Sequence, residues 1–211
     1  MADFQDLIEG YRRFRETGWR RERERWSELA EGQSPKVMVI ACSDSRVEPA
    51  QIFDARPGEM FVVRNVANLV PPFEPDNAYH GVSAALEFAV TQLEVEELVV
   101  LGHGFCGGCA AALTGQFDEA GHGAGHFIAH WIDMLKGARE RIRAGHPVLD
   151  RPAFEAMELE GVRISLANLR TFPWVREREA AGRLKLHGAW FAISDGCLHL
   201  LDEASGEFEP A

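Results

Sequence analysis

The side chains with the clearest potential for chemistry are two thiols and an imidazole that follow two short apolar runs. Cys42 comes directly after the run at 37–41, and His103 and Cys106 come after the run at 97–101. If these runs form neighbouring strands of a parallel sheet, their carboxyl ends share the edge at which such folds bind ligands. Two thiolates and an imidazole are one of the ligand sets that hold catalytic zinc with a fourth position open. The pattern therefore indicates a candidate zinc site.

Each of these residues also has a plain structural interpretation. A single buried cysteine commonly acts as a small apolar residue, and a single histidine commonly belongs to the core or the surface. Here Asp44 and Arg46 follow Cys42 within four positions, and His103 lies in a glycine-dense turn. Such glycines are typical of tight turns and of places where the backbone approaches a ligand closely. This combination favours a functional site over isolated structural residues.

Other motifs overlap the second segment. Gly102-x-Gly104-x-x-Gly107 follows a strand and resembles a dinucleotide fingerprint, but no strand ending in an acidic residue comes about twenty residues later. Cys106 and Cys109 form a C-x-x-C pair, which is typical of thiol redox centres. A redox role for this pair would leave Cys42, Asp44 and Arg46 without a function. As a fourth ligand, Cys109 would instead close the site into a structural zinc centre.

The elements that must position these residues predict an α/β fold, with a mostly parallel central sheet flanked by helices. Short runs rich in Val and Ile, at 37–41, 60–63 and 97–101, alternate with helix-like segments such as 79–93.

The C-terminal part carries a different signal. The Asp-Gly pair at 195–196 lies between the apolar segments 184–193 and 197–202, which predicts an antiparallel edge hairpin. The N-terminal residues 1–31 carry helical apolar stripes broken near Gly18, which predicts a helical arm that packs on the core or on a partner subunit. No linker or repeat follows, so we expect a single domain over residues 1–211.

Composition excludes several classes of function. With 22 basic and 33 acidic residues the net charge is −11, which disfavours nucleic acid and anionic membranes as partners. No apolar run reaches the roughly 18 residues of a membrane span, and no secretory or transit segment is expected. Four cysteines are too few for a disulfide framework. We therefore expect a soluble protein of the reducing cytoplasm.

Six segments together resemble the β-class carbonic anhydrases, and among these the plant-type branch. The most specific are the paired CSDSR and HxxC elements. The segments are GQSPKVMVIACSDSRVEP (32–49), PGEMFVVRNVANLVPPF (57–73), GVSAALEFAV (81–90), LVVLGHGFCGG (98–108), SLANLRTFPWV (165–175) and LKLHGAW (184–190). The arm matches in character only.

The resemblance implies a site and an assembly. Zinc would be held by Cys42, His103 and Cys106, beside an Asp44–Arg46 dyad. The family forms dimers that often assemble further, with active sites at the subunit interface.

The implied activity is the reversible hydration of CO2 to bicarbonate and a proton by zinc-bound hydroxide. Two thiolates cancel the charge of the zinc ion, so we expect a less acidic bound water than in a three-histidine site and activity that rises through alkaline pH. Asp44 would accept a hydrogen bond from that water, and Arg46 would keep the carboxylate ionised. Alternatives on the same scaffold are hydrolysis of a related heterocumulene such as carbon disulfide and a non-catalytic zinc- or bicarbonate-sensing subunit.

The resemblance also assigns the substrate pocket. Phe61 and Val66 would form apolar walls, while the Gln33 side chain and the Gly107 amide would donate hydrogen bonds; core packing is an alternative explanation for the two walls. Phe88 occupies the position of a pocket aromatic that is tyrosine in plant-type members, so its hydroxyl is missing.

Family members in which the aspartate coordinates zinc carry a tryptophan three residues before the first cysteine. That residue is Val39 here, so we expect Asp44 to stay off the metal and to keep its pair with Arg46. His122, His126 and His130 recur every four residues, and we interpret them as ordinary surface histidines.

Overall fold

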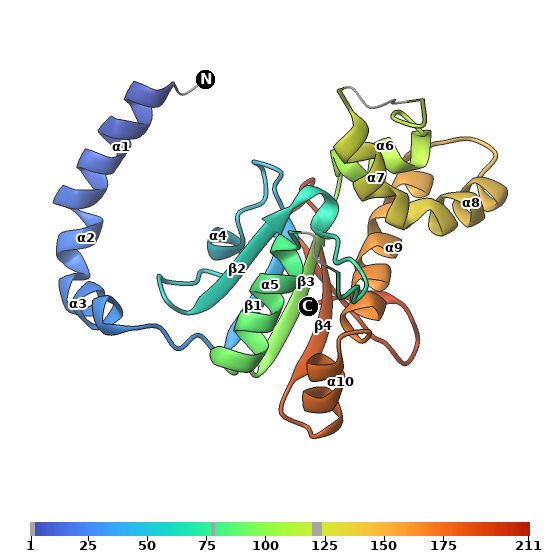
Figure 1. Cartoon of the computed structure of the whole chain (residues 1–211). Coiled ribbons are helices and arrows are strands. Elements are labelled where there is room, and N and C mark those ends of the chain that lie inside the picture. Colours follow the sequence, from blue (N-terminus) through green and yellow to red (C-terminus); the bar gives the residue numbers. More distant parts are fainter. Residues whose placement is uncertain (1–2, 77–78, 120–123) are drawn as a thin grey trace. The chain divides into compact units, whose positions relative to one another are not determined.

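The computed structural model of the chain describes residues 3–76, 79–119 and 124–211 (Figure 1). The chain divides into two compact units, Met1–Ser34 and Pro35–Ala211. The first unit corresponds closely to the arm expected over residues 1–31.

The N-terminal unit contains three helices where the sequence predicts two pieces. They are α1 (Phe4–Glu16), α2 (Gly18–Arg21) and α3 (Arg23–Glu31). Asp3 caps α1 through a reciprocal pair of hydrogen bonds with Asp6, which satisfies backbone N–H groups that the first turn leaves free. The Phe14 and Trp26 rings meet edge to face with centroids 5.9 Å apart, so the two predicted apolar stripes contact each other.

The second unit contains one six-stranded sheet with the order β2-β1-β3-β4-β5-β6. The first four strands in this order pair in parallel. β5 pairs antiparallel with β4, and β6 pairs antiparallel with β5. The strands are β1 (Val37–Cys42), β2 (Met60–Asn65), β3 (Glu97–His103), β4 (Lys185–Phe191), β5 (Leu198–Leu201) and β6 (Phe208–Pro210). The predicted mostly parallel sheet is confirmed. The edge is longer than the expected hairpin because β6, a three-residue strand with a proline, gives almost no local signal.

Helices and short helical turns connect the strands. The helices are α4 (Pro49–Ile52), α5 (Gly81–Glu87), α6 (Gly107–Thr114), α7 (His126–Ile132), α8 (Lys136–Gly145), α9 (Arg151–Leu169) and α10 (Pro173–Ala180). The turns are η1 (Val66–Asn68), η2 (Phe88–Gln92) and η3 (Asp133–Leu135). The helix expected over 79–93 is α5 continued by η2, a single π-helical turn.

Alternating strand residues build the main core on one face of the sheet. Met38, Ile40 and Val100 are fully buried there against side chains of α5, α9 and α10. Val39 and Ala41 point to the opposite face, where they pack with residues at the end of α4. Successive side chains of a strand point to opposite faces of the sheet, so each apolar side chain lies on one of these two faces.

The longest helix of the second unit, α9, lies directly on β3 and β4. A Cβ at Gly102 would come within 2.6 Å of Val162 Cγ2, and one at Gly188 would come within 3.0 Å of Leu166 and of Val162. These glycines therefore allow the helix to approach the sheet closely.

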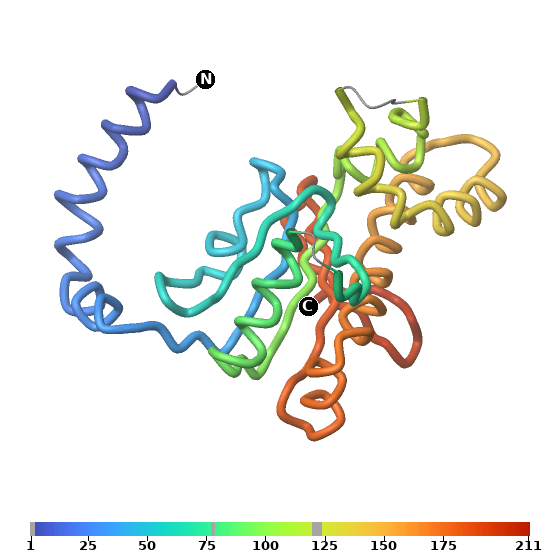
Figure 2. The backbone as a smooth tube through the Cα atoms, viewed as in Figure 1, coloured from blue at the N-terminus to red at the C-terminus, as the bar shows by residue number. Residues whose placement is uncertain are grey.

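A helical layer lies beside the carboxyl end of β3. The chain passes from β3 into α6, and α7 and α8 pack beside α6 (Figure 2). Among the described residues no helix is both long and apolar enough to cross a membrane.

Candidate metal centre

Strand order brings the two chemical segments of the sequence to one edge of the sheet. β1 pairs directly with β3, with Ala41 opposite Leu101, so Cys42 and His103 leave the sheet side by side. Because both strands run in the same direction, their loops meet at the carboxyl edge.

The ligand atoms of Cys42, His103 and Cys106 all lie within 4.8 Å of one another. Their side chains are nearly inaccessible, with relative exposures of 5%, 1% and 1%. The Cys42 and Cys106 sulfurs are 3.9 Å apart. Two thiolates bound tetrahedrally to one zinc ion stand roughly 3.8 Å apart, given Zn–S bonds of about 2.3 Å. The three residues therefore fit a zinc ion, and among the residues that the structure describes no other cluster of this kind occurs.

The His103 ring is oriented as a metal ligand requires. Its Nδ1 lies 2.8 Å from the Gly104 carbonyl, which can only accept a hydrogen bond, so the proton resides on Nδ1. The other ring nitrogen, Nε2, is buried and has no hydrogen-bond partner in the described part of the chain. A buried nitrogen lone pair without a donor is costly, and a cation at this position would satisfy it.

The surroundings of the two thiols raise the pKa of each. Contact with the Cys106 sulfur and burial raise the pKa of Cys42 to about 12. Contact with Cys109 and burial likewise raise the pKa of Cys106 well above its ordinary value. Beside Cys42, the backbone N–H of Ala67 donates to Sγ at 3.3 Å. The thiols thus hold their protons until a cation replaces them, as expected of cysteine ligands.

Burial acts on the imidazole in the opposite direction to its effect on the thiols, because the charged form of histidine is the protonated one. Burial is the largest single influence and lowers the pKa of His103, but the Cys42 sulfur, the Gly104 carbonyl and the Asp44 carboxylate together raise it above its ordinary value.

Asp44 and Arg46 form a two-pronged ion pair beside the cluster. Arg46 Nε donates to Oδ1 at 2.9 Å and Nη2 to Oδ2 at 2.7 Å, and the Arg46 backbone N–H also donates to Oδ1. These hydrogen bonds hold the pKa of Asp44 well below its usual range. Arg46 Nη2 also donates to the Phe105 carbonyl at 2.9 Å, which joins the dyad to the loop of the other two ligands.

Arg64, which was not among the expected site residues, organises the loop that follows Cys42. Its guanidinium donates to the carbonyls of Cys42, Asp44 and Val47 and pairs with Glu48. The available signal was an arginine directly after the four apolar residues of a strand, since such a side chain must find partners when it is half-buried.

Of the expected pocket residues, Val66 and Gly107 lie beside the cluster. Val66 belongs to η1, and a Cβ added at Gly108 would come within 2.7 Å of its Cγ1, so it packs against the start of α6. Gly107 is the first residue of α6, where backbone N–H groups have no acceptor within the helix.

Phe61 and Phe88 lie together but away from this chain's cluster. Their ring centroids are 5.9 Å apart. Phe61 pairs with Met38, four positions before the level at which Cys42 pairs with Asn65, which corresponds to about 13 Å along the strand. Gln33 belongs to the N-terminal unit, whereas the cluster belongs to the second unit, so its role in the pocket stays a prediction.

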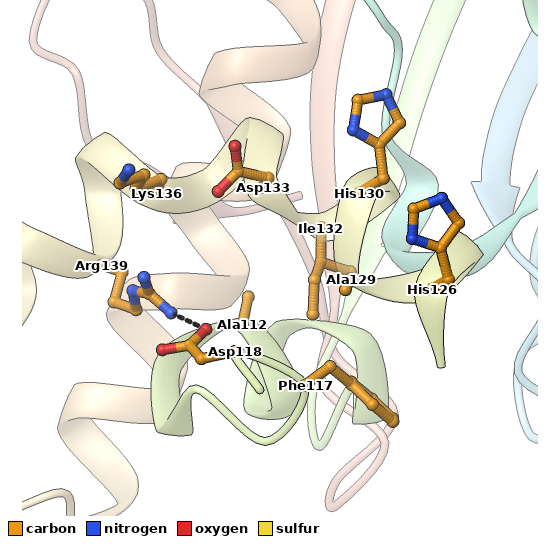
Figure 3. Close-up of a pocket in the computed structure, with 10 residues that line it drawn as sticks. All are labelled: Ala112, Phe117, Asp118, His126, Ala129, His130, Ile132, Asp133, Lys136 and Arg139. Atoms are coloured by element: carbon orange, nitrogen blue, oxygen red, sulfur yellow. Dashed lines mark hydrogen bonds and ion pairs between the residues drawn. The ribbon is translucent and has the colours of Figure 1, made fainter. Parts of the chain in front are cut away.

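A separate cavity of about 370 Å³ lies among α6, α7 and α8 and has no cysteine in its lining (Figure 3). His126 and His130 line it, together with Lys136 and an Asp118–Arg139 ion pair of 2.6 Å. His122 lies outside the described residues. Neither His126 nor His130 belongs to the candidate metal cluster.

Comparison with known proteins agrees with this geometry. A family model described as carbonic anhydrase matches residues 37–198. The mitochondrial β carbonic anhydrase 6 of Arabidopsis thaliana is 39% identical over 196 residues, which are 92% of this chain. The chain spans 66% of the length of that relative.

Solved structures show the same fold. The β-carbonic anhydrase CcaA is 30% identical and superimposes with a TM-score of 0.92 over the whole of both chains. One of two β-carbonic anhydrases from Sordaria macrospora, described as tetrameric, is 27% identical, with a TM-score of 0.79 over 94% of this chain and 96% of that one.

Proposed function

The chain belongs to the β-class carbonic anhydrases, and from this premise we propose that it is a zinc enzyme that reversibly hydrates CO2 to bicarbonate and a proton. The observation that carries the proposal is the convergence of Cys42, His103 and Cys106, whose ligand atoms lie within 4.8 Å in a buried site. When bound there, zinc would lower the pKa of a water molecule and so supply a nucleophile, increasingly as the pH rises through the alkaline range.

The Asp44–Arg46 pair would orient the attacking water. An ionised carboxylate only accepts hydrogen bonds, so Asp44 would hold one O–H and leave the oxygen lone pair facing the substrate. Arg46 donates two hydrogen bonds to Oδ1 and one to Oδ2, which keeps the group charged and in place and leaves Oδ2 able to accept one more. This role needs no proton transfer to Asp44.

The pocket would combine apolar walls with few donors, which suits an apolar substrate and an anionic product. Val66 would contribute a wall, and the Gly107 backbone N–H at the start of α6 would donate to bicarbonate. Because Phe61 lies about 13 Å along its strand from this chain's cluster and its ring contacts that of Phe88, we assign Phe61 and Phe88 to the site of a neighbouring subunit. We include Gln33 with them because the family resemblance implies active sites at the subunit interface. The enzyme would therefore work as a homodimer or a higher homo-oligomer.

The location is also part of the proposal. Cys42 and Cys106 must stay reduced to bind a metal, and all four cysteines are free. A reducing compartment such as the cytoplasm suits this requirement.

Metal analysis combined with stopped-flow CO2 hydration tests the proposal. We expect about one zinc per chain and a hydration rate that rises through alkaline pH. Cys106→Ser should lose both the metal and the rate, because it removes a ligand. Cys109→Ser is the matched control, since it changes the neighbouring buried thiol, and it should keep both.

Other outcomes would overturn the proposal. A zinc-loaded protein that hydrolyses carbon disulfide but does not hydrate CO2 would assign the scaffold to the related substrate. Zinc binding with neither activity would indicate a sensing subunit, and loss of zinc in Cys109→Ser alone would indicate a structural metal centre.

A further inference from the structure

Glu158 is a carboxylate almost completely removed from solvent, on the side of α9 that faces the candidate metal centre. The residue is only 3% exposed. Burying a carboxylate costs several kcal/mol unless its charge is paired and its lone pairs are used. Its Oε1 accepts the backbone N–H of Cys106 at 3.3 Å. This contact joins a buried charge to the backbone of a candidate zinc ligand.

Arg151 supplies the charge that Glu158 needs. Its two terminal nitrogens donate to Glu158 at 2.9 and 2.6 Å in a parallel fork, which is the strong geometry of a guanidinium–carboxylate pair. Both residues belong to α9, about two turns apart. The helix therefore holds the pair in a fixed position beside the ligand loop.

The Arg151 guanidinium also covers the loop between His103 and Cys106. Its central carbon lies 4.3 Å from the centroid of the Phe105 ring, within the range of a cation–π contact. Phe105 has a left-handed backbone with φ of 57°, which is costly for a residue with a side chain. The contact stabilises the ring of the one residue in this loop whose backbone is strained.

Phe105 also contacts the Asp44–Arg46 dyad. The Phe105 carbonyl accepts a hydrogen bond from Arg46 Nη2 at 2.9 Å, and the same nitrogen donates to Asp44. The direction of this carbonyl follows from the left-handed backbone. Contacts that hold Phe105 therefore also hold the guanidinium that orients Asp44.

We propose that Glu158 and Arg151 are positioning residues for the zinc site, which fix the Cys106 ligand through its backbone N–H and the Asp44–Arg46 dyad through Phe105. Stability alone is a weak reason for such a pair, because replacing a buried ion pair with apolar residues is often neutral or stabilising. The two sets of contacts instead lead to the two halves of the site. This inference rests on the proposed function only for its effect on turnover.

The test compares Glu158→Gln and Arg151→Lys with the matched control Glu160→Gln in the full-length protein. Glu158→Gln keeps the shape of the side chain and removes the charge. Arg151→Lys keeps the charge but loses the fork and the flat stacking surface. Glu160 lies two residues further along α9 and pairs with Arg141 and Arg163, away from the metal loop.

Two measurements report on metal binding without relying on activity. We expect the zinc dissociation constant of Glu158→Gln and Arg151→Lys, measured by competition with a chromophoric chelator, to rise by about 10-fold or more, as is typical when support for a ligand is lost. The visible spectrum of the cobalt(II)-substituted protein should change, because it reports ligand geometry. Glu160→Gln should match the unaltered protein in both measurements.

A third measurement concerns the dyad. At saturating zinc, the CO2 hydration rate of the two variants should fall by about 10-fold, because Arg46 loses the support of its carbonyl anchor. Circular dichroism and thermal unfolding verify that each variant is folded.

The proposal is wrong if the folded variants keep the zinc affinity and the cobalt spectrum of the unaltered protein. If Glu158→Gln does not fold, Arg151→Lys decides, since it leaves the buried carboxylate compensated. If the unaltered protein binds zinc and cobalt but does not hydrate CO2, the proposed function fails, while the two metal measurements still judge the positioning role.

Discussion

At the scale of single residues, the site separates groups that must lose a proton from a group that is already ionised. The pKa of Cys42 is raised to about 12 by the Cys106 sulfur and by burial. The Arg46 hydrogen bonds hold the pKa of Asp44 far below its usual range. A cation must therefore displace protons from the thiols, whereas the carboxylate is charged before the cation arrives. This difference suits the thiols as ligands and Asp44 as a fixed acceptor.

The role of Asp44 leads to a prediction about activity. Asp44→Asn places an amide donor where the proposed mechanism needs an acceptor, without changing the metal ligands. We expect the variant to keep about one zinc per chain and to lose about 10- to 100-fold in CO2 hydration, measured by stopped flow.

Asp118→Asn is the control for this prediction. It breaks another aspartate–arginine ion pair, Asp118–Arg139, in the separate cavity, and it should keep both zinc and activity. Full activity in Asp44→Asn would remove the dyad from the mechanism.

At the scale of elements, the close approach of α9 to the sheet delivers Glu158 to the metal loop. Gly102 in β3 leaves no room for a side chain, since a Cβ there would meet Val162 Cγ2 at 2.6 Å. The chain continues from Gly102 directly into His103. Packing of the helix on the strand and positioning of the ligand are therefore coupled.

This packing predicts the cost of one added methyl group. Gly102→Ala should destabilise the fold by about 1–3 kcal/mol, the usual cost of overpacking a filled core, measured by denaturant unfolding at fixed protein concentration. Combining it with Val162→Ala removes the clashing methyl, so the double variant should lose less than the sum of the two single variants.

Gly145→Ala is the control, because a Cβ at Gly145 meets nothing within 4 Å, and it should change stability by less than about 0.5 kcal/mol. Strictly additive effects of Gly102→Ala and Val162→Ala would contradict the close contact.

At the scale of the whole molecule, the second unit exposes several large apolar side chains, some beside the cluster and some away from it. In the second unit, Val62, Val66, Phe88 and Phe105 are exposed by 38%, 37%, 45% and 51%. Large exposed apolar groups commonly mark surfaces that contact another protein. They agree with the proposal that a second copy of the chain completes the pocket.

This leads to a prediction about assembly. Light scattering after size-exclusion chromatography should give a particle of at least twice the 23.5 kDa of one chain. An active particle with the mass of one chain would show that a single chain builds the whole site, and would remove Phe61, Phe88 and Gln33 from the pocket.

Local patterns along the chain were enough to predict the main strands and the chemical groups at their ends. Strand and helix patterns are local, so the positions of β1, β2 and β3 and the placement of Cys42 and His103 at the carboxyl ends of two of them were predictable. Weak local signals were missed, among them the short strand β6 and the second break in the arm.

Which of these groups meet depends on how the whole chain folds. Pairing of β1 with β3 brings Cys42 to His103 across sixty residues of sequence, and packing of α9 brings Glu158 to Cys106. Residues far apart in the chain are joined by burial and by satisfied hydrogen bonds, which depend on the complete packing and have no local pattern. For the same physical reason the support of the site by Arg151 and Glu158 could be seen only once the chain was folded.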